Sequence, residues 1–153
     1  MVDSRSSLEM RALRYLAQRE YSRRELEQKL SVYARSCASE ALSTVLDKLE
    51  QNGFLSAERA AEQIARVRRS RFGSQRIVYE LKEKGIDEHL IGSVLPYLKQ
   101  TEFDTAVKVW QKKFGRSPGS REERGKQVRF MLSRGFSMEI IRQVLSQANE
   151  ESL

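Results

Sequence analysis

The residues with the clearest chemical potential in this sequence are arginines and lysines, gathered in three runs that contain no acidic residue. The runs span residues 66–79, 108–116 and 124–134. Because a guanidinium group can form two parallel hydrogen bonds with a phosphate or a carboxylate, such runs predict contact surfaces for a polyanion or an acidic protein. The alternative is a solvated helix end, where cations also interact favourably with the helix dipole.

Candidate contact residues come from these runs and from the helix expected around residue 80. Tyr79 would lie beside Arg76 on the exposed side of that helix, where it could stack on a base or anchor a protein contact. An ordinary surface tyrosine is the alternative. The candidate set is Arg66, Arg68, Arg69, Arg71, Arg76, Tyr79, Lys82, Lys108, Lys112, Lys113, Arg116, Arg124, Lys126 and Arg129.

Signals for catalysis or metal binding are missing from the sequence. Cys37 is the only cysteine, so no disulfide within the chain and no cysteine-based zinc site can form. We expect His89 to be a surface residue and Cys37 a small apolar side chain, because nothing orders a histidine against the thiol. Glu80, four residues from both Arg76 and Lys84, is expected to support its helix. Since no phosphate-binding loop, HExxH motif or catalytic triad pattern is present, we predict no enzyme activity, no cofactor and no metal.

Composition and charge narrow the class of protein. The chain has 153 residues, of which 39% are hydrophobic and 32% charged. The hydrophobic share lies below the globular norm of about 45–50%, so one large core is not expected. The net charge of +7 favours nucleic acid, or a protein bound to it, over a membrane as partner. There is no signal-peptide pattern and no run of about 20 apolar residues, so we expect a soluble cytoplasmic protein.

The elements that must position these side chains are short amphipathic helices. In the stretch 72–95, Ile77 and Leu81 fall on one side of a helix that ends at Gly85, because glycine readily adopts the left-handed conformation. Asp87 then occupies the position of an N-cap, so a second helix starts at once. Two short helices cannot bury their apolar faces alone, so this unit requires neighbours.

The sequence repeats this unit. The segments LKEKGIDEHLIGSVL (81–95) and MLSRGFSMEIIRQVL (131–145) align at an offset of 50 residues. Gly85 then matches Gly135, and the N-cap residue Asp87 matches Ser137. A further copy, at an offset of 51 residues, aligns Tyr21 with Phe72. We therefore predict an all-α fold of three tandem three-helix repeats in an elongated, curved array, with the repeats at 8–55, 56–98 and 102–148.

Local signals predict where several helices start and end. S-x-x-E patterns at Ser22 and Ser120 predict capping boxes. Gly53 is predicted to end a helix by the same device as Gly85, with the following residue packed back over the helix. Pro96 is expected to bend or end its helix, because proline removes a backbone hydrogen bond. The last helix is predicted at 138–148, before a frayed tail.

A family resemblance is carried by Gly53-Phe54-Leu55, by the arginine-rich run and by the stretch GSQRIVYELKEKGI (73–86). Together these residues resemble the central repeat of the bacterial RecX family, and the similarity extends over nearly the whole chain. The resemblance implies a negative regulator of the RecA recombinase that lies along the groove of the RecA filament on single-stranded DNA. It further implies inhibition of filament extension, ATP hydrolysis, strand exchange and repressor cleavage, within homologous recombination, DNA repair and the SOS response.

The partner expected from this resemblance is the RecA filament on single-stranded DNA. Weak direct binding to DNA is a further expectation, and we expect a monomer without membrane contact. The middle-repeat arginines, with Tyr79 and Lys82, are the first candidates for the contact surface, and the basic runs of the third repeat are the second.

Two other functions fit part of the sequence. A helix-turn-helix DNA-binding protein also contains three short helices with a tight glycine corner. Its recognition helix would be rich in Asn, Gln and Arg, whereas the candidate EHLIGSVL (88–95) is poor in them. A scaffold that binds only protein is the other alternative, and it predicts negligible binding to free DNA at physiological salt.

Overall fold

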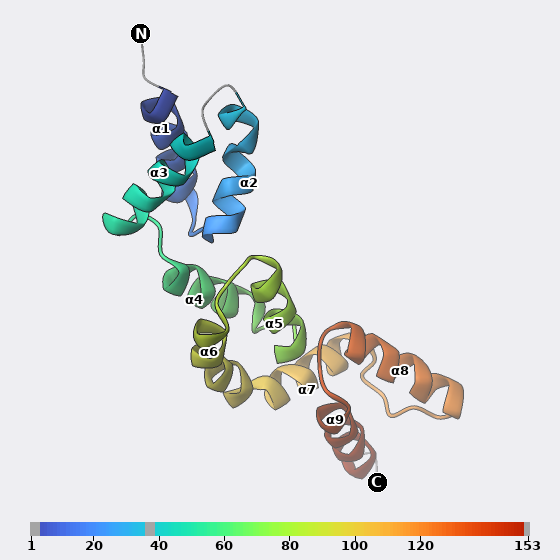
Figure 1. Ribbon diagram of the computed structural model, residues 1–153. Helices are drawn as coiled ribbons and strands as arrows, with labels where there is room; N and C mark the ends of the chain where they lie inside the picture. The colour runs from blue at the N-terminus through green and yellow to red at the C-terminus, as the bar shows by residue number, and fades with distance from the viewer. Residues whose placement is uncertain (1–3, 36–38, 152–153) are drawn as a thin grey trace. The chain divides into compact units, whose positions relative to one another are not determined.

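The structure of the chain is a computed structural model that describes residues 4–35 and 39–151. These residues form nine α-helices and no strand, so the predicted all-α class is confirmed (Figure 1). The prediction for Cys37 lies outside the described residues. The helices are α1 (Ser4–Gln18), α2 (Arg23–Ala34), α3 (Ser39–Gln51), α4 (Ala57–Arg68), α5 (Ser74–Glu83), α6 (Glu88–Gln100), α7 (Glu102–Lys113), α8 (Arg121–Ser133) and α9 (Met138–Glu151).

Contacts within the chain define two compact units. Unit 1 consists of Met1–Gln63 and Leu81–Leu90, and unit 2 consists of Ile64–Glu80 and Ile91–Leu153. Helices α1, α2 and α3 therefore belong to unit 1 and α7, α8 and α9 to unit 2, whereas α4, α5 and α6 contribute residues to both. The boundaries of the three repeats and their elongated, curved arrangement stay predictions.

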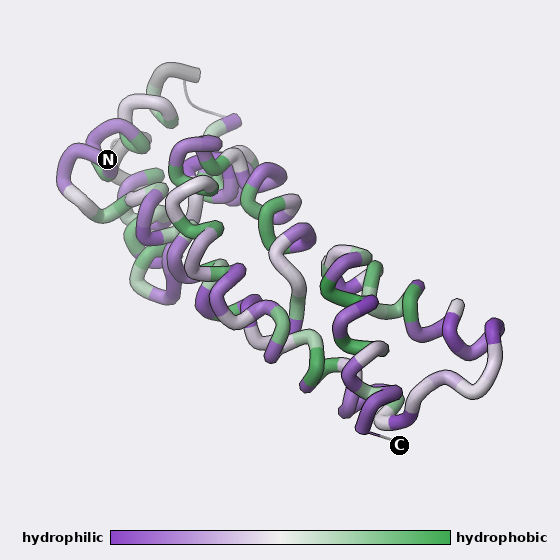
Figure 2. Tube along the Cα trace, turned by 90° about the horizontal axis from the view of Figure 1, so that it is seen from below, coloured by the Kyte–Doolittle hydropathy of each residue, from purple (hydrophilic) through white to green (hydrophobic). Residues whose placement is uncertain are grey.

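In unit 1, helices α1, α2 and α3 pack against one another around a hydrophobic core. Hydrophobic and hydrophilic stretches alternate along the helices, as expected when each helix buries one face (Figure 2). The buried residues of this core are Leu8, Ala12, Tyr21, Leu26, Leu30, Ala41, Val45, Leu46, Leu49 and Leu55.

The capping box predicted at the start of α2 is present. Ser22 Oγ accepts a hydrogen bond from the backbone N–H of Glu25 (3.1 Å), and the Ser22 N–H donates to Glu25 Oε1 (3.0 Å). At the start of α8 half of the box forms, because Ser120 Oγ accepts from the Glu123 N–H (3.1 Å). The Glu123 carboxylate instead accepts from the N–H of Gly119 (2.6 Å), so the residue before the N-cap supplies the donor.

Glycines with positive φ end three of the helices as predicted, with φ of +79°, +76° and +91° at Gly53, Gly85 and Gly135. Ile86 and Phe136, which follow two of these glycines, are buried. Phe54 differs from the prediction, because its side chain is 53% exposed and Leu55 is buried in its place. The backbone N–H groups of Phe54 and Leu55 both donate to the same carbonyl near the end of α3. After Gly53 the second residue, Leu55, enters the core, whereas after Gly85 and Gly135 it is the first residue.

In unit 2, helices α7, α8 and α9 pack against one another around a second core. Trp110 Nε1 donates to Gln127 Oε1 (2.8 Å), and Gln127 Nε2 donates to the carbonyl of Arg116 (3.0 Å). Both polar atoms of the buried Gln127 side chain therefore have a hydrogen-bond partner. The buried residues of this core are Ala106, Trp110, Met131, Phe136, Ile141, Val144, Leu145 and Ala148.

Of the two outcomes predicted at Pro96, a bend or an end of the helix, the structure excludes the second, because helix α6 continues to Gln100. The carbonyl that loses its partner belongs to Gly92, which is exposed, so water can replace the missing bond. Helix α9 continues to Glu151, beyond the predicted end at residue 148, because Ala148 is buried in the core and holds the last turns against it.

Each unit contains a joint of the same kind. In each joint, residues at or just before the start of one helix contact the glycine turn that follows another helix. In the first joint, in unit 1, Arg24 of α2 donates to the carbonyl of Glu83 at the end of α5 (3.2 Å). In the second joint, in unit 2, the N–H of Gly73 donates to the carbonyl of Arg134 after α8 (2.7 Å). The first joint comprises Arg19, Tyr21, Arg24, Glu25, Glu83, Lys84 and Gly85, and the second comprises Phe72, Gly73, Arg76, Arg134 and Gly135.

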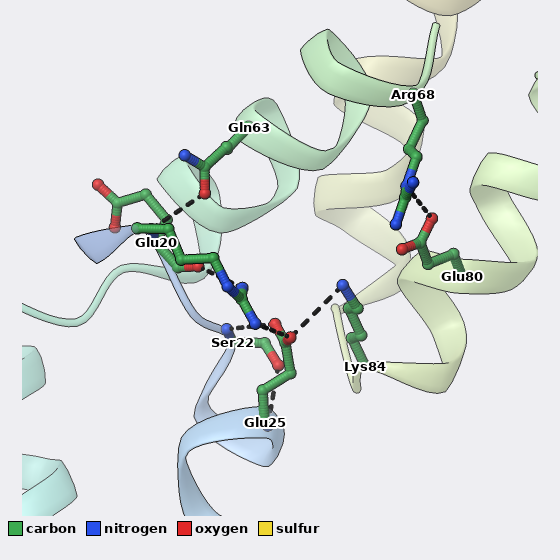
Figure 3. Close-up of polar contacts among 8 residues, drawn as sticks. Glu20, Ser22, Glu25, Gln63, Arg68, Glu80 and Lys84 are labelled. Carbon is green, nitrogen blue, oxygen red and sulfur yellow. Dashed lines mark hydrogen bonds and ion pairs between the residues drawn. The ribbon is translucent and has the colours of Figure 1, made fainter. Parts of the chain in front are cut away.

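A carboxylate pairs with two cations in the first joint. The Glu25 carboxylate accepts from Arg19 (3.0 Å) and lies 3.4 Å from Lys84 Nζ, and Figure 3 shows Glu25 between Ser22 and Lys84. The guanidinium of Arg19 also lies over the ring of Tyr21 (3.6 Å). Burial alone would raise the pKa of Glu25, but the hydrogen bonds from the Ser22 backbone and Arg19, with the charge of Lys84, hold that pKa below its ordinary value.

Candidate anion-binding site

A concave site lies next to the second joint, within unit 2. Its volume is about 860 Å³, and it is formed by the loop after α4, the first turn of α5, the second half of α7 and the end of α8. Six of the lining residues are basic and none is acidic. We call this site the basic groove; it is lined by Ser70, Arg71, Phe72, Arg76, Lys108, Val109, Lys112, Lys113, Phe130 and Arg134.

The backbone of the second joint brings these segments together. Besides the bond from Gly73 to Arg134, the N–H of Gln75 donates to the carbonyl of Gly135 (3.2 Å). A Cβ atom on Gly73 would overlap the backbone of Gly135, so the close approach requires glycine at this position. The first and third basic runs, about 60 residues apart in the sequence, therefore meet in one site.

Phe72 is the centre around which the arginines of the groove are arranged. The guanidinium groups of Arg76 and Arg134 lie 4.4 and 5.2 Å from the centroid of its ring, within the range of cation–π attraction. Arg76 also donates to the carbonyl of Ser133 (3.0 Å), and Arg134 donates to the carbonyl of Arg71 (3.3 Å). Both guanidinium groups are thus held in place before any ligand binds.

A second aromatic ring and three lysines complete the groove. Arg134 and Lys113 lie 5.2 and 5.3 Å from the centroid of Phe130. Lys108 and Lys112 are exposed on α7 and stand four residues apart, where like charges repel by about 0.2–0.5 kcal/mol. A bound anion would relieve this repulsion.

The structure separates the predicted contact residues into different environments. Arg71, Arg76, Lys108, Lys112 and Lys113 line the basic groove. The other members of the set lie elsewhere, and the described structure gives several of them a different role.

Two arginines of the first run are engaged by neighbouring helices. Arg68 forms an ion pair with Glu80 of α5 (3.2 Å), which Figure 3 shows, so Glu80 also interacts beyond the helix support predicted for it. Arg69 donates to Thr101 Oγ1 (2.6 Å) and lies over the ring of Tyr97 (3.9 Å). Both side chains therefore help to hold unit 2 together.

The remaining candidates do not reach the groove. Arg124 lines a separate cavity of about 510 Å³ at the start of α8, and Lys82 belongs to unit 1. Tyr79 is 66% exposed, as predicted for a residue on the outer side of α5. The other exposed candidates are Arg66, Arg116, Lys126 and Arg129.

The predicted set did not include Phe72, Phe130 or Arg134. A signal for the two phenylalanines was present, because each basic run contains a cation followed directly by phenylalanine, at Arg71-Phe72, Lys113-Phe114 and Arg129-Phe130. Aromatic residues interleaved with cations are typical of nucleic-acid-binding surfaces.

Metal binding and membrane insertion find no structural support. Across residues 4–35 and 39–151, no group of three or more His, Cys, Asp or Glu side chains is placed to bind a metal ion. His89 is exposed, as predicted. None of the helices in the described ranges has the length and apolarity needed to cross a lipid bilayer.

The fold and the groove define a class of protein: an all-helical repeat protein with a basic, aromatic-lined surface. Comparison with known families is consistent with this class. Residues 58–95 match the family model described as RecX, second three-helix domain, and residues 100–145 match the one described as RecX, third three-helix domain. The predicted repeat fold is thereby confirmed.

Whole-chain relatives extend the match. Regulatory protein RecX of Ralstonia pickettii (strain 12J) is 42% identical over 144 residues, which cover 94% of this chain and 89% of the relative. Regulatory protein RecX of Leptothrix cholodnii (strain ATCC 51168 / LMG 8142 / SP-6) is 42% identical over 145 residues, covering 95% and 91%. The crystal structure of RecX from Lactobacillus salivarius has the same fold, with a TM-score of 0.79 at 23% identity over 97% of this chain and 99% of that one. The chain belongs to the RecX family, and its relatives are named as regulatory proteins.

Proposed function

We propose that this protein is a negative regulator of the RecA recombinase. It binds along the groove of the RecA filament on single-stranded DNA and hinders filament extension, ATP hydrolysis, strand exchange and co-protease activity. The observation that carries the proposal is membership of the RecX family, with 42% identity to a regulatory protein RecX over 94% of the chain.

The basic groove supports the proposal electrostatically. A RecA filament on DNA is a polyanion, and a groove with six cations and no acid favours such a partner through charge attraction and counterion release. Each of the three predicted repeats, at 8–55, 56–98 and 102–148, would offer its own contact to successive protomers. Several weak contacts in series give a combined affinity far above that of any one of them.

The test is an ATPase titration. RecA is first assembled on single-stranded DNA with ATP, and this protein is then added in increasing amounts. We expect ATP turnover to fall at well below one molecule of this protein per RecA protomer, because a regulator that blocks filament growth acts on many protomers at once. A control titration uses an unrelated protein of similar size and positive charge, which should leave turnover unchanged.

Turnover that stays constant across the whole titration would remove the proposed function. Equal inhibition by the control protein would also count against it, because the effect would then follow from positive charge alone.

A further inference from the structure

The two joints differ in the charge of one position. At the repeat offsets of 51 and 50 residues, Phe72 corresponds to Tyr21, Arg76 to Glu25 and Arg134 to Lys84. The first joint contains a carboxylate that lies between two of its cations, since Glu25 pairs with both Arg19 and Lys84. The second joint has an arginine in place of that carboxylate.

The second joint therefore gathers guanidinium groups around one ring. Arg76 and Arg134 lie nearest to it, and Arg68, which pairs with Glu80, lies 5.9 Å from the ring centroid. Arg76 and Arg134 both lie within 5.2 Å of the centroid of Phe72, and no acidic residue lines the surrounding groove. Like charges this close are costly to gather unless an anion offsets them. With an arginine at the position of Glu25, the groove has six cations and no carboxylate, which favours an anionic ligand.

We propose that the basic groove binds the sugar-phosphate backbone of single-stranded nucleic acid. This inference rests on the proposed function, because it assigns the groove to the DNA strand of the filament and leaves the RecA protein to other surfaces.

The hydrogen-bonding character of the lining favours nucleic acid over an acidic peptide. Arginine and lysine are donors only, and among the lining side chains the hydroxyl of Ser70 is the one hydrogen-bond acceptor. The carbonyl of Arg71 already accepts from Arg134. A peptide would bring an N–H group on every residue that needs an acceptor, whereas a phosphodiester backbone offers acceptors only.

Two flat surfaces favour a single strand over a duplex. Phe72 and Phe130 are each half-buried, and the guanidinium carbons of Arg76 and Arg134 lie 4.4 and 5.2 Å from the centroids of these two rings. Unpaired bases stack on aromatic rings and on arginine planes without regard to sequence, but a duplex conceals its base faces. We expect sequence-tolerant binding of a single strand.

The experiment measures binding of the full chain to fluorescent oligo(dT) of about 15 nucleotides by anisotropy, over a series of salt concentrations. The first variant, Lys108→Gln with Lys112→Gln, changes exposed lysines that hold no structural contact in the joint. We expect roughly tenfold weaker binding at about 0.1 M salt, and a salt slope reduced by about 1.4, because each lost phosphate contact removes about 0.7. The matched control, Lys99→Gln with Arg142→Gln, removes the same charge from exposed positions of unit 2 outside the groove and should bind almost as wild type does.

A second variant tests the joint itself. Arg76→Glu recreates in the second joint the carboxylate that Glu25 provides in the first. We expect a melting temperature within about 4 °C of wild type, because Arg134 gains an ion-pair partner as Arg76 loses its bond to Ser133. Binding of the oligonucleotide should fall at least as far as in the lysine variant.

Four results would overturn the inference. They are the absence of oligonucleotide binding by the wild-type chain, an equal loss of binding in the control variant, equally tight binding of a duplex, and displacement of the oligonucleotide by poly-glutamate of equal charge as readily as by unlabelled oligo(dT). The outcome is separable from the proposed function, since RecA inhibition by the wild-type chain is measured independently. Groove variants that lose RecA inhibition but keep oligonucleotide affinity would assign the groove to protein and contradict this inference alone.

Discussion

Basic residues that look alike in the sequence have different roles in the structure. Arg68 and Arg69 are engaged by Glu80 and Thr101, whereas Arg71 and Lys112 line the groove. The exposed ion pair between Arg68 and Glu80 contributes only about 0–1 kcal/mol, but it gives that guanidinium a partner within the chain. Whether an arginine is available to bind a ligand therefore depends on the residues that it already contacts.

Glu25 gives a prediction at the residue scale. Its pKa in the folded state lies below the ordinary value, so its contribution to stability is present above the unfolded pKa and is lost as the pH falls through the folded pKa. We expect Glu25→Gln to lower the free energy of unfolding by about 1 kcal/mol near pH 7 through the weakened capping box. The difference from wild type should shrink on acidification below about pH 4.5, the ordinary value for this group.

Urea unfolding of both proteins at several pH values measures this difference. Glu27→Gln is the matched control, because Glu27 is exposed on the same helix, and its effect should be small at every pH. A Glu25→Gln difference that stays constant from neutral to acidic pH would contradict the ion-pair account.

At the scale of elements, the joints show how short helices gain stability from their neighbours. The start of α5 is held by the carbonyls of Arg134 and Gly135, and the buried carboxylate of Glu102 accepts from the N–H of Ser74. These acceptors satisfy N–H groups that a helix cannot satisfy within itself. The same contacts align α5 with α7 and α8, which form the walls of the groove.

Two glycines give a paired prediction for these elements. Gly73→Ala places a methyl group against the backbone of Gly135, which cannot move aside as a side chain could, so we expect a loss of at least about 1–3 kcal/mol. Gly92→Ala meets no neighbour within 4 Å and lies inside α6, so we expect a gain of about 0.5–1 kcal/mol. Thermal and urea unfolding distinguish the two, and a neutral Gly73→Ala variant would show that the joint is looser than described.

At the scale of the whole molecule, the candidate contact residues are unevenly distributed. With the exception of Lys82, all of them fall in unit 2. Unit 1 has a core of its own and a joint in which Glu25 pairs with two cations. Unit 2 thus concentrates the surface on which the proposed function depends.

A charge reversal tests this concentration. Arg68→Glu is unsuitable, because it would place a second carboxylate against Glu80 and destabilise the contact between α4 and α5. We expect Arg71→Glu with Lys112→Glu to raise the amount of protein needed for half-inhibition of RecA ATP turnover at least about tenfold, through the loss of contacts to the polyanion. Circular dichroism should show unchanged helical content, and undiminished inhibition by this variant would place the filament contact outside the groove.

Much of the fold followed from local sequence signals. The capping box at Ser22 and the left-handed glycines at Gly85 and Gly135 were predicted, because such signals act between residues a few positions apart. A prediction failed where burial against the core changed the outcome. Helix α9 extends to Glu151, since its buried face outweighs the local preference to stop.

The sequence by itself determined the helices, their glycine corners, the internal repeat and the positive charge of the three runs. Only the tertiary structure decided which of those charges share a site. The first and third runs are joined by backbone hydrogen bonds at the second joint, and a backbone carbonyl has the same chemistry in every residue. Side-chain types could therefore predict basic surfaces, but not that Arg76, Arg134 and Lys112 would line one groove around Phe72.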